Sequence, residues 1–170
     1  MPDEARGKEL EEAIEREAKR VEEDCIHSSK AHYNAAVGWS RCHYIIGIPT
    51  VLLAAVASAL ALNDMALVAG VLSVVVAALA AVNTFLNPAD REAVHKAAGG
   101  EYGAVRNRAR RLREIHLLTL DAAALQDRIE TLAEERDSLN LSCPGIPRWA
   151  YLLARRGIET GEAEHRVDQD

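Results

Sequence analysis

Hydrophobic residues gather in two long uncharged runs near the middle of the chain, Tyr44–Leu62 and Met65–Leu86. Only Asn63 and Asp64 separate the two runs. An α-helix rises about 1.5 Å per residue, so helices over these runs would be roughly 28–33 Å long. The hydrocarbon core of a bilayer is about 30 Å thick. The pattern therefore predicts a helical hairpin that crosses a membrane twice, at 44–62 and 65–86.

The segment before the hairpin has the pattern of one amphipathic helix. Apolar or small residues recur every three or four positions from Leu10 to Ser28, and charged residues occupy the other faces. No glycine or proline interrupts the stretch 8–37. We expect this helix to continue directly into the first span.

The segment after the hairpin also has a helical pattern. Asn87-Pro88 suits a helix junction, because proline is favoured in the first turn of a helix. An apolar stripe resumes at Tyr102, shifts by one or two residues near 116–118, and continues to Leu139 in steps of four and three. Such steps are typical of a coiled-coil seam. We interpret this segment as one long helix that ends before Cys143.

These patterns predict an all-α membrane protein, a two-helix transmembrane hairpin with long cytoplasmic helical arms. Its expected parts are an N-terminal cytoplasmic amphipathic helix (1–43), the hairpin (44–86), a C-terminal cytoplasmic long helix (87–141), and a short terminal amphipathic helix with a tail (142–170). Orientation follows from lysine and arginine, which favour the cytoplasmic side. The outer ends of the hairpin carry such residues and its turn has none, so both termini should be cytoplasmic.

Average composition conceals this organisation. The 170 residues carry a net charge of −6, 27% are charged and 49% are hydrophobic. The mean hydropathy is −0.11, because charged flanks offset the apolar middle. A single aqueous core is not expected, since the middle quarter of the chain prefers lipid.

Small residues recur every fourth position in both spans. Close approach of small residues is what favours helix association in lipid. Such rows can hold the hairpin together or hold several copies together, and both interpretations stay open. The rows are Thr50, Ala54 and Ser58 in the first span, and Ala69, Ser73, Ala77 and Ala81 in the second.

Few polar side chains lie within the spans. Asn83 and Thr84 near the cytoplasmic end, together with Thr50 and Ser58, are candidates to line a water path. Alternatively, the hydroxyls bond back to their own helix. Two helices cannot enclose a channel, so a pore would require a ring of several copies.

Five arginines lie within eight residues in the C-terminal arm, at positions 106, 108, 110, 111 and 113. If both arms are straight helices, this block lies beside the acidic residues at 17–24 of the N-terminal arm. Pairing between the arms is one interpretation. The other is a phosphate-bearing ligand held by Arg106, Arg110 and Arg113, which share one helix face.

Motifs of catalysis or metal binding are absent from the sequence. The glycine-rich stretch 99–103 follows no strand and does not fit a phosphate loop. The histidines lack the spacing of metal ligands. We therefore expect no enzyme, no cofactor and no metal, with membrane lipid and further copies of the chain as partners and no nucleic acid.

Several residues together resemble the SLATT family, which comprises two-transmembrane effector domains associated with nucleotide-generating and nucleotide-sensing proteins in bacterial conflict systems. The resemblance covers roughly residues 30–163. The residues that carry it are Trp39, Arg41, His43, Pro49, Phe85-Leu86-Asn87-Pro88, Arg91, His95, Gly99, Tyr102, Arg106, Arg110, Arg136, Leu139-Asn140, Pro144, Ile146-Pro147-Arg148-Trp149-Ala150-Tyr151 and Gly157-Ile158-Glu159-Thr160-Gly161-Glu162.

The resemblance implies an oligomeric pore-forming or membrane-disrupting effector of antiviral defence or abortive infection, located in the bacterial inner membrane. A nucleotide second messenger or a nucleotide-synthesising partner protein would activate it. The residues leave two other hypotheses open. The chain could be a membrane-anchored helical interaction scaffold without pore activity, or a soluble bundle that buries 44–86 in a dimer.

Overall fold

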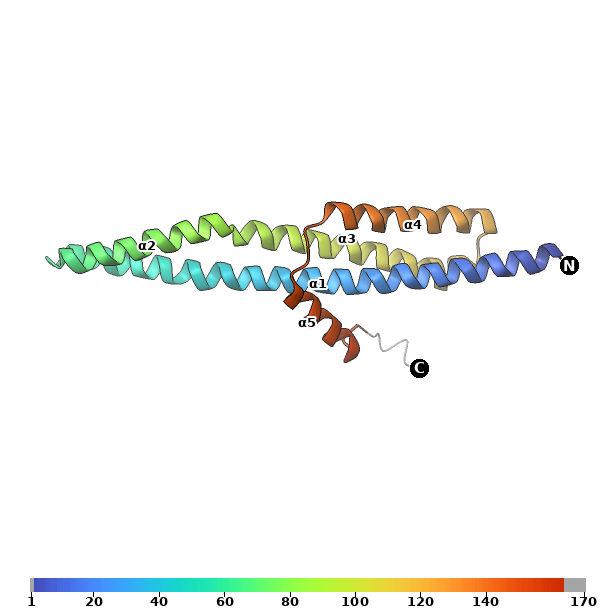
Figure 1. Ribbon diagram of the computed structural model, residues 1–170, viewed down its shortest axis with the longest axis horizontal. Coiled ribbons are helices and arrows are strands. Elements are labelled where there is room, and N and C mark those ends of the chain that lie inside the picture. The colour runs from blue at the N-terminus through green and yellow to red at the C-terminus, as the bar shows by residue number, and fades with distance from the viewer. Residues whose placement is uncertain (1, 164–170) are drawn as a thin grey trace. The chain divides into compact units, whose positions relative to one another are not determined.

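The computed structural model describes residues 2–163, with side chains from residue 6 onward (Figure 1). The described residues form five α-helices and one short 3-10 helix, without any β-strand, which confirms the all-α class. Within the predicted terminal segment 142–170, residues 164–170 lie outside the described residues. The elements are α1 (Pro2–Ala61), α2 (Ala66–Leu86), α3 (Pro88–Glu114), η1 (His116–Leu118), α4 (Ala122–Ser142) and α5 (Arg148–Glu159).

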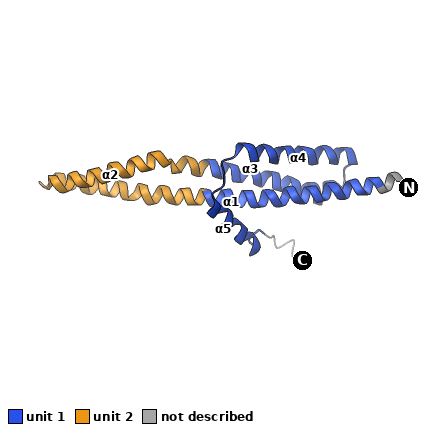
Figure 2. Cartoon of the chain, viewed as in Figure 1, with its two compact units in different colours: residues 1–35, 94–170 blue, residues 36–93 orange. Residues whose placement is uncertain are grey.

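The chain divides into two compact units (Figure 2). Unit 1 comprises Met1–Ala35 and Val94–Asp170, and unit 2 comprises Ala36–Ala93. Helices α1 and α3 each contribute to both units. Unit 2 therefore extends several residues beyond each end of the predicted hairpin.

Unit 1 is built around α1, α3 and α4, which lie side by side (Figure 1). Each helix contributes one apolar stripe to a shared core. Val21 of α1, Leu112 of α3 and Leu125 of α4 are among its largest fully buried side chains. The core comprises Ile14, Ala18, Val21, Cys25, Tyr102, Val105, Ala109, Leu112, Leu125, Ile129 and Leu132.

The prediction of one long helix over 87–141 is wrong. Helix α3 ends at Glu114, and α4 begins at Ala122 after the 3-10 turn His116–Leu118. Asp121 caps α4 by accepting a hydrogen bond at 2.8 Å from the backbone N–H of Ala124. The shift in the apolar stripe near 116–118 is thus the point at which the chain turns back.

This reversal determines what the apolar stripes at 10–28 and 102–139 pack against. On a straight arm, apolar surface of these stripes would stay exposed and available for contact with other copies of the chain. In the folded chain they pack against one another as the three-helix core. Unit 1 therefore buries its main apolar stripes without a partner.

Unit 2 leaves its apolar side chains exposed. Two helices are long and apolar enough to cross a membrane, and only 6% of the most apolar stretch of each is buried. Leu67 is 83% exposed and Phe85 is 87% exposed. The core helix of a soluble protein would be mostly covered, so the exposure supports membrane association.

Short turns delimit α2. Asp64, in the turn before it, has a φ of 56°, and Asn87, directly after it, has a φ of 43°. Both residues thus adopt the left-handed conformation, which asparagine and aspartate tolerate better than most residues. Asn87 also donates its backbone N–H to the carbonyl of Asn83, so it closes α2 directly before Pro88 begins α3.

Candidate functional site

The predicted rows of small residues meet across one groove in unit 2. Ala54 and Ser58 of α1 line it together with Ala69, Ser73 and Ala77 of α2, and its volume is about 560 Å³. The rows thus face each other within the chain and leave an open groove between the helices. The other two members of the predicted rows, Thr50 and Ala81, do not line it.

The serine and threonine hydroxyls in the candidate spans bond to their own helices. Thr50 and Ser58 donate to the carbonyls four residues earlier at 2.7 and 2.9 Å. Ser73 and Thr84 do the same, both at 2.9 Å. Asn83 differs, because its side-chain oxygen is buried without a hydrogen-bond partner among the described residues. Within one copy, therefore, none of the four hydroxyls needs water to satisfy its proton.

The three arginines predicted to hold a phosphate do not converge on one ligand. Arg113 pairs with Glu22 of α1 at 3.3 Å, in the register expected for neighbouring antiparallel arms. Arg110 lies 4.0 Å from Glu114 of its own helix. Arg106 donates two hydrogen bonds to the adjacent Asn107. The face is therefore occupied mainly by pairing within the chain.

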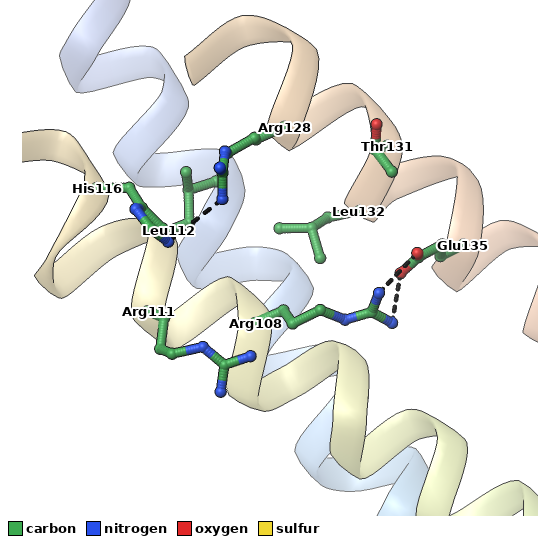
Figure 3. Close-up of a pocket in the computed structure, with 8 residues that line it drawn as sticks. All are labelled: Arg108, Arg111, Leu112, His116, Arg128, Thr131, Leu132 and Glu135. Atoms are coloured by element: carbon green, nitrogen blue, oxygen red, sulfur yellow. Dashed lines mark hydrogen bonds and ion pairs between the residues drawn. The ribbon is translucent and has the colours of Figure 1, made fainter. Parts of the chain in front are cut away.

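A basic pocket of about 240 Å³ lies between α3 and α4 (Figure 3). Leu112 and Leu132 form its apolar part, and Arg108 is neutralised there by Glu135 through contacts of 2.6 and 2.8 Å. The other cationic side chains have no carboxylate partner among the described residues. Arg111 makes no polar contact with another described side chain, and the Nη1 atom of Arg128 lies 3.4 Å from Nε2 of His116.

A buried histidine pair joins α1 to α3 in unit 1. Nδ1 of His32 and Nδ1 of His95 lie 2.9 Å apart, so the N–H of one ring donates a hydrogen bond to the nitrogen of the other. His32 also stacks on Tyr102, with ring centroids 5.5 Å apart. Burial, and secondarily the neighbouring His95, lower the pKa of His32 to about 4. The pair is therefore held in a form in which at least one ring is neutral.

Many residues that carry the family resemblance make contacts between helices of the same unit. In unit 2, the Arg91 guanidinium lies 4.8 Å from the ring centre of Trp39. In unit 1, the Tyr102 hydroxyl donates to Asn140 at 2.9 Å. Gly99 accepts a hydrogen bond from Ser29 at 2.7 Å and leaves room for the Tyr33 ring. These residues therefore have structural roles whatever else they do.

Neither the histidine pair nor the basic pocket is indicated by a local pattern in the sequence. His32 and His95 are 63 residues apart and belong to no local motif. They do lie at similar distances outside the two apolar runs, so the register of antiparallel arms could have paired them. The pocket had no comparable signal, because it exists only where α4 turns back onto α3.

Among residues 2–163 no three histidine, cysteine, aspartate or glutamate side chains gather as metal ligands. No protein-family model matches the chain, and neither a curated protein nor a solved structure shows significant similarity to it.

Proposed function

We propose that unit 2 anchors the chain in the bacterial inner membrane as a hairpin, with both termini in the cytoplasm. The exposed apolar surface of α2 and of the end of α1 is the main support for this proposal, because without a membrane this surface would be in contact with water. The absence of lysine and arginine from the turn supports the orientation.

Cysteine labelling in intact vesicles tests the topology. In a background without the three native cysteines, Glu11→Cys and Glu159→Cys should react from the same side of the membrane. Asp64→Cys in the turn should react only from the opposite side. Labelling of the first two positions from opposite sides, or removal of the protein by a carbonate wash, would refute the hairpin.

We further propose that the chain is a SLATT-type effector, a non-enzymatic protein that assembles and permeabilises the membrane in nucleotide-signalled antiviral defence or abortive infection. The residues shared with that family support the proposal. The groove of small residues in unit 2 is the surface where a helix of another copy could approach closely. Self-assembly and membrane lipid are thus the central interactions of the proposed function.

Dye release from reconstituted vesicles tests the effector role. Wild-type protein at increasing protein-to-lipid ratio should release an encapsulated dye, because assembly is driven by concentration. Ser73→Leu combined with Ala77→Leu fills the groove and should abolish release. Val74→Leu combined with Ala78→Leu has the same spacing on the same helix but lies outside the groove, so release should persist. Equal release by both double variants would exclude the groove as the assembly surface.

A specific observation favours a second candidate, a membrane-anchored helical scaffold without pore activity. All four serine and threonine hydroxyls in the spans donate to their own backbone, so these side chains leave no polar row ready to line a water path. The arms of the scaffold would bind other proteins, and the vesicles would stay sealed. Intact vesicles at every protein-to-lipid ratio, with and without an added nucleotide, would favour it over the effector.

The basic pocket between α3 and α4 is the proposed site for a phosphate-bearing signal. Arg111 and Arg128 have no carboxylate partner in the part of the chain that the structure describes, and guanidinium groups match the geometry of phosphate oxygens. We propose that a nucleotide second messenger binds here, rather than at Arg106, Arg110 and Arg113. An activating nucleotide-synthesising protein is the alternative source of the signal.

Titration of the detergent-solubilised chain with ADP tests this site. Arg111→Gln combined with Arg128→Gln should weaken binding by about tenfold or more, since a hydrogen bond to a charged group contributes about 1.5–3 kcal/mol. Arg16→Gln on the exposed face of α1 is the control and should bind like the wild type. Absence of ADP binding, or equal affinity of the double variant, would remove the pocket from the proposal.

A further inference from the structure

Helix α5 packs on α1 through its smallest residues. Ala150, Ala154 and Gly157 are spaced four and three apart and are buried. Asn34 of α1 donates a hydrogen bond to the carbonyl of Ala150 at 3.4 Å. Lys30 of α1 pairs at 2.5 Å with Glu162, just after α5. This face and these two contacts fix α5 to α1 within unit 1.

The large apolar residues of α5 point away from this contact. Trp149, Leu152 and Leu153, at spacing i, i+3 and i+4, form one stripe on the helix. They are 45%, 50% and 54% exposed. A helix that only needed to cover the core of unit 1 would bury this stripe and expose its alanines. Burial of the small residues instead leaves the stripe available to an apolar environment.

The charges around the stripe are mainly positive. Arg156 continues the stripe by one further step, and Arg148 and Arg155 flank it. Glu159 is the one acidic residue of α5, and it pairs with Arg155 at 2.8 Å. The net charge of the whole chain is −6, so the local excess of positive charge on α5 is opposite in sign to the net charge of the chain. Tryptophan and leucine beside arginine are typical of helices that lie in the lipid headgroup region.

The attachment point of α5 is close in sequence to the first candidate span. Asn34 precedes Tyr44, the first residue of that span, by only ten residues in the sequence. The headgroup region adds several ångströms outside the hydrocarbon core. Arginine side chains can extend further while their charged ends remain in water.

We propose that α5 is a membrane-surface helix, and that Trp149, Leu152 and Leu153 insert among anionic lipids on the cytoplasmic side. This inference rests on the proposed hairpin. It adds a second attachment to the membrane, which orders unit 1 against the bilayer surface. A bilayer is favoured as the occupant because the stripe combines an aromatic residue, two leucines and neighbouring arginines, and because the same chain has two candidate spans.

Quenching of tryptophan fluorescence by brominated lipid tests the proposal. The reporter is Trp149 in a Trp39→Phe variant, reconstituted into vesicles of phosphatidylglycerol and brominated phosphatidylcholine. The matched control moves the tryptophan to the other side of α5 through Trp149→Phe and Tyr151→Trp. Tyr151 is 46% exposed and Trp149 is 45% exposed, so the two positions differ in face and not in exposure.

Emission from Trp149 should fall strongly with brominated lipid and shift to shorter wavelength, whereas emission from position 151 should fall much less. Equal quenching at the two positions would overturn the proposal. A shift to shorter wavelength without quenching would also overturn it and would assign the stripe to a second copy of the chain. A carbonate wash keeps failure of this inference distinct from failure of the hairpin, because a spanning protein stays in the vesicles even if Trp149 is not quenched.

Discussion

The buried histidine pair makes the stability of unit 1 depend on pH. The pKa of His32 is lowered to about 4 from the ordinary value of 6.5, because the ring is only 1% exposed and adjoins His95. The unfolded chain therefore binds a proton at higher pH than the folded chain does. The stabilising contribution is complete above about pH 6.5, and it is lost as the pH falls from there towards 4.

The magnitude follows from the difference in pKa. One pKa unit corresponds to about 1.4 kcal/mol, so the shift of His32 corresponds to roughly 3 kcal/mol between neutral pH and pH 4. That is a large share of the typical 5–15 kcal/mol stability of a folded domain. Protonation of both rings would also remove the hydrogen bond between the two Nδ1 atoms, since neither could then accept.

Urea unfolding of the full chain in detergent, followed by circular dichroism at several pH values, measures this effect. His32→Gln retains a side chain able to donate a hydrogen bond but removes the titrating ring. Its unfolding free energy should therefore fall less between pH 7 and pH 4 than that of the wild type. His27→Gln, on the same helix and outside the pair, is the control for the loss of a histidine side chain. If His32→Gln keeps the wild-type pH dependence, the reasoning from burial is refuted.

Three further predictions concern unit 1. Leu125→Ala should lower the unfolding free energy by about 2–5 kcal/mol in the same urea assay, because the Leu125 side chain is fully buried in the three-helix core. The Leu118 side chain is 84% exposed, so Leu118→Ala should change the unfolding free energy by no more than about 0.5 kcal/mol. Glu22→Lys should lower the unfolding free energy by about 1 kcal/mol, because it places a cation beside Arg113 of α3. Glu23 is exposed, so Glu23→Lys should leave the unfolding free energy unchanged, and equal effects of the two variants would contradict the pairing of Glu22 with Arg113. Cys25 is fully buried with its pKa raised to about 11 by burial, so a variant that keeps only this cysteine should react with maleimide after unfolding and not before.

The positions of the candidate spans could be predicted from sequence because hydrophobicity is a local property. Each run is long and uncharged, and each is followed by residues that favour a turn, Asn63-Asp64 and Asn87-Pro88, so no distant contact is needed to identify it. The helix junction at Asn87-Pro88 was predictable for the same reason, since proline restricts the chain locally.

The interruption at 115–121 could not be predicted in this way. The segment contains neither glycine nor proline, and the apolar spacing on either side of it is helical. A small shift in that spacing fits a continuous coiled coil and a reversed helix equally well. The choice is made by burial of Leu125, Ile129 and Leu132 against α1 and α3, which a straight arm would leave in water.

The sequence by itself determined the helical class, the two apolar runs and the faces of the helices that are apolar. The tertiary structure alone decided which faces meet. It brought His32 to His95, created the basic pocket between α3 and α4, and turned the small side of α5 inward with Trp149 outward. The physical reason is that periodicity shows that a stripe exists, whereas its partner depends on how residues far apart in the chain can pack together.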